Sequence, residues 1–140
     1  MKTMKYKYSI IEHAADIKLK ITASAKEGLF KGGLEGMAWI MVEDEDIEKE
    51  SIEKRIEISA LEENILLVDF LSEVLAQSDI YNSVFPEIEI EEFTEQKIIG
   101  KIKGKRIKRF KEEIKAVTYH GANICKNKQG LWEITILFDI

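Results

Sequence analysis

Apolar and polar residues alternate in two short segments near the start of the chain, residues 4–11 and 16–23. In the second segment, lysines alternate with Ile17, Leu19 and Ile21. A period of two residues is typical of a β-strand that buries one face. We therefore predict two strands in this part of the chain.

The spacing changes to that of a helix over residues 24–41, where apolar residues recur three and four positions apart. Ser24 and Glu27 have the spacing of a capping box, which places Ser24 at the N-cap. The helix also contains four glycines, each of which costs about 1 kcal/mol relative to alanine. Close approach of this helix to a sheet would accommodate them; they are Gly28, Gly32, Gly33 and Gly36.

A second helix is predicted at residues 62–80, where apolar residues are too dense for an exposed helix. The acidic segment 43–50 is interpreted as a loop. The other apolar segments are predicted to be strands, and they span residues 51–60, 84–94, 97–104, 113–125 and 131–139. Turns are expected at residues 95–96 and 127–130.

This order of elements predicts an α+β fold, a two-layer sandwich with two helices on one face of a mixed or antiparallel sheet. The length of 140 residues is that of one domain, so residues 1–140 are assigned to a single domain. No segment approaches the roughly 18 continuous apolar residues of a membrane span, and the first residues lack the apolar region of a signal peptide. Cys125 is the only cysteine, which excludes an internal disulfide. We expect a cytoplasmic protein.

The charges are unevenly distributed along the chain. The formal net charge is −5, which argues against a dedicated nucleic-acid binder. Segment 43–50 is strongly acidic, whereas segment 101–111 contains seven of the 21 lysines and arginines. The sequence therefore predicts a lopsided charge distribution. The basic segment is interpreted either as a solvated face or as a surface for RNA phosphates or an acidic partner.

Two aspartates stand at the ends of predicted strands. Residues 131–140 form an apolar run that finishes on Asp139 and Ile140, and Asp16 begins the second strand. The two carboxylates, with a carbonyl or the terminal carboxylate of Ile140, would form an all-oxygen pocket suited to a hard divalent cation. On spacing alone, the alternative of two solvated turn residues stays open.

Other chemistry is sparse. Two histidines are too few for a typical histidine-rich metal site, and the sequence lacks a phosphate-binding loop and a Gly-x-Ser-x-Gly motif. His13, beside Glu12 and Asp16, is either a general base or a structural hydrogen-bonding residue. Lys115 interrupts an apolar stretch, as edge protection or as a positioned charge.

Three segments together resemble the archease family: Glu12-His-Ala-Ala-Asp-Ile17, Lys115-Ala-Val-Thr-Tyr-His-Gly121 and Phe138-Asp-Ile140. With Leu66-Leu-Val-Asp-Phe-Leu71 between them, the similarity extends over essentially the whole chain. Ala14 stands where the family usually has threonine, and Phe70 stands where tryptophan is common. Neither difference removes a charged group.

The resemblance implies a non-catalytic partner of an RtcB-type RNA ligase, which seals tRNA exon halves. Such a partner promotes guanylylation of the ligase, supports multiple turnover and meets tRNA through the ligase. The resemblance also implies that Asp16, Asp139 and Ile140 hold a divalent metal ion, calcium. Lys115, His120 and His13 are implied in partner contact and activation.

Two other functions remain as alternatives. The first is a stand-alone RNA-binding or chaperone-like module that uses the basic segment 101–111. The second is a small metal-dependent hydrolase built on Asp16 and Asp139, for which the sequence supplies no separate base.

Overall fold

The computed structural model describes residues 4–12 and 15–140. Within these ranges the chain forms eight strands, two α-helices and a short 3-10 helix. In chain order they are β1 (Tyr6–Glu12), β2 (Asp16–Ala23), α1 (Lys26–Met41), η1 (Asp44–Asp46), β3 (Ile47–Ser59), α2 (Glu63–Tyr81), β4 (Ser83–Thr94), β5 (Lys97–Ile107), β6 (Ala116–Thr118), β7 (Cys125–Lys126) and β8 (Trp132–Asp139).

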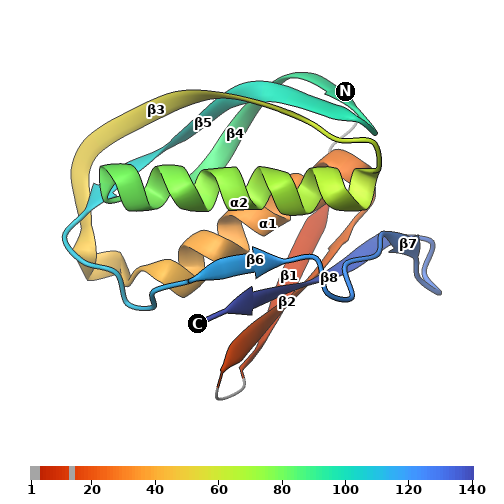
Figure 1. Ribbon diagram of the computed structural model, residues 1–140, viewed down its shortest axis with the longest axis horizontal. Coiled ribbons are helices and arrows are strands. Elements are labelled where there is room, and N and C mark those ends of the chain that lie inside the picture. Colours follow the sequence, from red (N-terminus) through yellow and green to blue (C-terminus); the bar gives the residue numbers. More distant parts are fainter. Residues whose placement is uncertain (1–3, 13–14) are drawn as a thin grey trace.

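The strands form two antiparallel sheets with the helices between them (Figure 1). One sheet has the order β1-β2-β8-β6, with the short β7 also paired to β8. The other has the order β3-β5-β4. Helix α1 contacts strands of both sheets, and so does α2. No helix in the described residues is long and apolar enough to span a membrane.

The α+β class and the antiparallel pairing predicted from the sequence are confirmed, but three layers replace the expected two. Each sheet has the helices on one of its faces, so both helices need apolar residues on two sides. The dense apolar positions of α2 meet this need, since Leu66, Leu67, Val68 and Phe70 are all buried. Apolar spacing indicates which residues are buried but does not indicate how many sheets bury them.

The glycines of α1 allow this helix to lie unusually close to β2. A Cβ atom added at Gly28 would lie 2.7 Å from the Cβ of Ala23, and one at Gly36 would lie 2.6 Å from a methyl group of Leu19. Gly32 faces Ile21 between them, again at 2.6 Å. Real Cβ contacts are not this short, so a side chain at these positions would force the helix or the strand to move. The expectation of close approach to a sheet is confirmed.

Lys26, the first residue of α1, joins several elements at one end of the molecule. Its ammonium group lies 2.7 Å from Glu63 of α2 and 2.9 Å from Glu95 in the turn between β4 and β5. It also lies 4.5 Å from the centre of the Trp132 ring on β8. The two carboxylates raise the pKa of Lys26 through hydrogen bonds, so the lysine stays charged. One side chain therefore connects both helices with both sheets.

The predicted capping box is absent. Helix α1 begins at Lys26 with Ala25 as its N-cap, and no side chain caps it. The Ser24 hydroxyl instead accepts a hydrogen bond from the Lys5 backbone N–H, at 3.2 Å. Ser24 thus connects the start of β1 to the end of β2, a tertiary contact that the local spacing of Ser24 and Glu27 could not indicate.

Two predicted boundaries are wrong, one because of a turn and the other because of a long-range strand pairing. The segment 113–125 is not one strand but the short β6 and β7, separated by a turn in which Gly121 has a φ of 68°. The acidic segment 43–50 is only partly a loop. It contains η1, and β3 already begins at Ile47 because Ile47 pairs with Ile107 at the far end of β5.

We expect Gly28→Ala to destabilise the fold despite the better helix propensity of alanine. The Cβ of Ala23 cannot rotate away, so overpacking should cost about 3 kcal/mol, against a propensity gain of about 1 kcal/mol. A net loss of about 2 kcal/mol is measurable as a lower urea midpoint. Lys31→Ala on the same helix is the control. Adding Ala23→Gly should recover part of the loss; no loss in Gly28→Ala would contradict the close packing.

The hydroxyl of Tyr6 on β1 donates a hydrogen bond to the Glu35 carboxylate on α1. Burial, together with this bond and the negative charge of Glu35, raises the pKa of Tyr6 from 10.0 to about 12. The folded state therefore favours the neutral phenol. The stability that this shift contributes is complete below pH 10.0 and is lost as the pH rises towards about 12.

In urea denaturation at alkaline pH, we accordingly expect Tyr6→Phe to lose less free energy of unfolding than the wild type as the pH rises from 10.0 to about 12. The other tyrosines are present in both proteins, so the difference isolates Tyr6. Tyrosinate absorbance should show one late-titrating group in the wild type that the variant lacks. If the free energy of unfolding fell equally with pH in the two proteins, the raised pKa of Tyr6 would be contradicted.

Candidate metal and partner site

The two aspartates singled out in the sequence lie directly opposite each other. Strands β2 and β8 pair antiparallel, with Asp16 in register with Asp139. Side chains at directly opposite positions lie on the same face of a sheet, and like charges there are destabilising. Asp16 is half-buried and Asp139 is exposed, so this acidic pair lies at the surface end of two neighbouring strands.

One oxygen of the pair lacks a partner. The Oδ1 atom of Asp16 is buried and has no hydrogen bond within residues 4–12 and 15–140. A buried carboxylate oxygen without a partner is costly, and a bound cation would remove both this cost and the repulsion from Asp139. The unpartnered oxygen of Asp16 and the facing carboxylate of Asp139 are therefore a suitable pair of oxygen ligands for a divalent cation.

Main-chain groups of three further residues, Ala15, Lys115 and Ile140, flank the acidic pair. The Ile140 N–H donates to the Ala15 carbonyl at 3.3 Å, which brings the end of the chain beside the start of β2. On the other side, the Lys115 N–H donates to the Asp139 carbonyl at 2.7 Å. In the described part of the chain, no three His, Cys, Asp or Glu side chains are grouped to hold a metal ion. Further ligands would therefore be main-chain oxygens or water.

The three residues implied in partner contact differ in their placement. Lys115 is exposed and precedes β6, beside the acidic pair. His120 is also exposed, but it lies in the turn after β6, beyond the pairing of Thr118 with Leu137, so it is at the other end of that strand. His13 lies outside the described residues. The structure thus brings Lys115, and not His120, next to Asp139.

Asp79 on α2 was not indicated by the sequence, although it shares a pocket with Lys115. It lines a shallow pocket of about 280 Å³ together with Lys115, Ala116 and Val117. Burial, and to a smaller extent the charge of Glu113, raises the pKa of Asp79. No sequence signal marks Asp79, because it stands on the polar side of a helix like many solvated residues.

The basic segment 101–111 is partly neutralised by the acidic segment 43–50. Arg106 lies 3.1 Å from Glu50, Arg109 lies 3.4 Å from Asp46, and Lys111 lies 3.2 Å from Glu43. Antiparallel pairing of β3 with β5 brings the acidic segment 43–50 beside the basic segment. The prediction of a lopsided charge distribution is therefore wrong where these two segments meet.

Comparison with known proteins gives one consistent result. A model of the Archease protein family (MTH1598/TM1083) matches residues 8–140. Protein archease of Methanosarcina mazei is 30% identical, with 96% of this chain and 96% of the relative covered. Protein archease of Thermococcus kodakarensis is 32% identical, with 96% of this chain and 99% of the relative covered.

Two solved structures share the fold. The crystal structure of an archease from Thermotoga maritima, described as a possible chaperone, superposes with a TM-score of 0.67 at 20% identity and covers 93% of this chain and 94% of that chain. The solution structure of protein 1598 of Methanobacterium thermoautotrophicum superposes with a TM-score of 0.70 at 24% identity, covering 95% and 98%.

The ion pairs of the basic segment predict weak binding to single-stranded RNA. Nearby carboxylates offset the cations, so RNA binding would release few counterions. In a plot of log binding constant against log salt concentration, each phosphate contact with a single strand should add about 0.7 to the magnitude of the slope. Fluorescence anisotropy with a labelled RNA at increasing salt should give a shallow slope. Reversing the charges of Lys105, Arg106, Lys108 and Arg109 should change it little. A steep slope that this variant abolishes would contradict the prediction.

Proposed function

This chain belongs to the archease family, and on that premise we propose that it is a non-catalytic accessory protein that activates an RtcB-type RNA ligase in tRNA splicing. It promotes guanylylation of the ligase and multiple turnover. It acts in the cytoplasm and meets tRNA through the ligase.

The observation that supports this proposal is the register of Asp16 with Asp139, which puts two carboxylates together at one surface end of the sheet. In the proposal, these carboxylates and a main-chain oxygen of Ile140 hold a divalent cation, for which calcium is the first candidate because all the ligands are oxygens. A bound divalent cation neutralises phosphate charge and orients phosphate oxygens.

The openness of the acidic pair favours action on a partner. Asp139 is exposed, and the neighbouring Lys115 is exposed as well, so both can contact a second protein without a change in this fold. Asp16 contributes the partly buried carboxylate of the pair. The register of β2 with β8 keeps the two side chains together. The rival reading as a stand-alone RNA binder has less support, since carboxylates lie against several cations of the basic segment.

The test is multiple-turnover joining of tRNA halves by a purified RtcB-type ligase from the same organism, with and without this protein. We expect stimulation by the wild type and loss of most of it with Asp16→Ala or Asp139→Ala, because either change removes half of the acidic pair. Glu57→Ala, which removes an exposed carboxylate from β3 in the other sheet, is the matched control. Full stimulation by both aspartate variants would refute the role of the pair.

Calorimetric titration with calcium provides a readout that does not involve the ligase. The wild type and Glu57→Ala should bind, whereas both aspartate variants should bind much more weakly while keeping the circular dichroism spectrum and melting temperature of a folded protein. Deleting Ile140 tests the main-chain ligand separately. Calcium binding without ligase stimulation would retain the metal site and reject the partner.

A further inference from the structure

A groove of about 410 Å³ runs beside the C-terminal half of α1. The residues that line it do not include the acidic pair. It has two aromatic side chains, Tyr8 of β1 and Trp39 of α1, and its acidic side chains are Glu35, Glu43, Asp44 and Glu87. We call it the Trp39 groove.

Trp39 is the unusual residue of this groove. It is 55% exposed, although it lies on a helix between two sheets and most of its neighbours on that helix are buried. An exposed indole next to apolar lining residues such as Val42 and Pro86 is typical of a binding surface rather than of a solvated helix face.

The charge of the groove favours a cationic ligand. Four carboxylates line it, and Lys111 is the one basic side chain among its lining residues in the described chain. The Lys111 ammonium lies 5.2 Å from the centre of the Trp39 ring and 3.2 Å from Glu43. The protein's own lysine therefore already shows that an ammonium group fits between the indole and a carboxylate.

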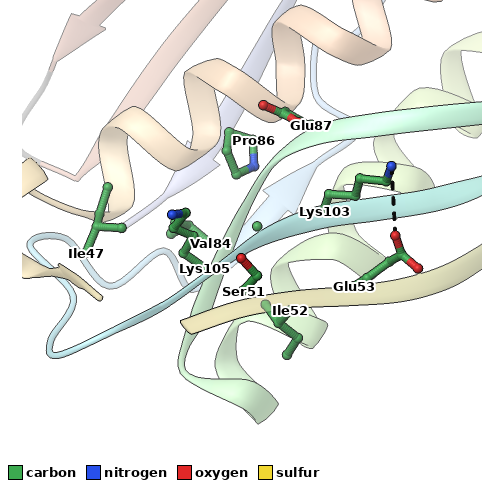
Figure 2. Close-up of a pocket in the computed structure, with 10 residues that line it drawn as sticks. Ile47, Ser51, Ile52, Glu53, Val84, Pro86, Glu87, Lys103 and Lys105 are labelled. Atoms are coloured by element: carbon green, nitrogen blue, oxygen red, sulfur yellow. Dashed lines mark ion pairs between the residues drawn. The ribbon is translucent and has the colours of Figure 1, made fainter. Parts of the chain in front are cut away.

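A second pocket, of about 460 Å³, adjoins the groove. Figure 2 shows the residues that line this pocket. The two share Ile47, Val84, Pro86 and Glu87. The second pocket lies where β3 and β4 both bulge relative to β5, on either side of Gly104. A Cβ at Gly104 would lie 1.7 Å from the Val84 carbonyl oxygen, so glycine is required for this close passage of β4.

We propose that the Trp39 groove and the adjoining pocket bind an extended, basic segment of a partner protein. An arginine or lysine of that segment lies on the Trp39 ring among the carboxylates, and an apolar residue of the segment enters the pocket beside Ile47 and Val84. A continuous groove suits an extended chain. The four carboxylates of the Trp39 groove repel phosphates, which favours a protein segment over RNA there. The adjoining pocket also has Lys103, which lies 2.7 Å from Glu89, and Lys105. The inference is independent of the acidic pair and goes beyond the proposed function by adding a second contact surface.

The probe is a labelled short peptide in which arginine alternates with valine, and its binding is measured by fluorescence anisotropy. We expect Trp39→Ala to weaken binding about tenfold, because the cation–π contact and the central anchor are lost. Lys111→Ala should instead strengthen binding severalfold, because it removes the internal competitor from the ring.

Lys126→Ala is the matched control. Lys126 also lies over a tryptophan ring, 5.0 Å from the centre of Trp132, and its removal changes the net charge by the same amount. Strengthening by Lys111→Ala alone therefore supports the groove, whereas equal strengthening by both variants means general electrostatic attraction and overturns the proposal. In a Trp132→Phe background, the peptide should also change the emission of Trp39, the one remaining tryptophan.

Three other outcomes would overturn the proposal. One is the absence of peptide binding, and another is binding that Trp39→Ala leaves unchanged. The third is displacement of the peptide by single-stranded RNA that itself binds better to the wild type than to Lys111→Ala, which would identify the groove with a nucleic acid. Melting temperatures of all variants confirm that each is folded before its affinity is compared.

Discussion

The packing of α1 directly on β2 is the constraint on which the rest of this structure depends. Gly28, Gly32 and Gly36 recur every four residues and face Ala23, Ile21 and Leu19, which recur every two. Four residues of helix rise about 6 Å and two residues of strand about 6.7 Å, so the two rows stay nearly in step over this length. A helix in the middle layer can then contact both sheets with little space lost to side chains.

The position of the acidic pair follows from this packing. Strand β2 carries apolar residues against the glycine row and has Asp16 at its first position. The same strand pairs with β8, whose last residue, Asp139, is thereby opposite Asp16. Residues far apart in the sequence thus meet at one end of a strand pair whose centre is held by the core. Two carboxylates in register repel each other, and the buried face of the sheet offsets this cost.

The second sheet brings opposite charges together in the same way. Pairing of β3 with β5 is set by their apolar faces, and it places the acidic stretch before β3 beside the basic end of β5. Three ion pairs between the two stretches then neutralise part of the charge of each. The Trp39 groove opens beside this region, where carboxylates exceed the free cations and one lysine already lies on the indole.

Much of this arrangement could be predicted from the sequence. Alternation identified β2 and β8, helical spacing identified α1 and α2 to within two residues at each end, and the odd placement of Asp16 and Asp139 at strand ends marked the acidic pair. Prediction failed where a distant segment decides the outcome. Ser24 hydrogen-bonds to Lys5 instead of capping α1, and Arg106 and Arg109 are paired with acidic side chains that lie more than fifty positions earlier in the chain.

The sequence by itself therefore determined most of the elements, the α+β class and the strand-end positions of Asp16 and Asp139, because local spacing records which face of each element is apolar. Only the tertiary structure decided the number of layers, the partial neutralisation of the basic segment, the placement of Asp79 beside Lys115 and the groove at Trp39. These features depend on which apolar faces pack together. Local spacing shows that a face is apolar, but it does not show which other face of similar size and pattern will cover it.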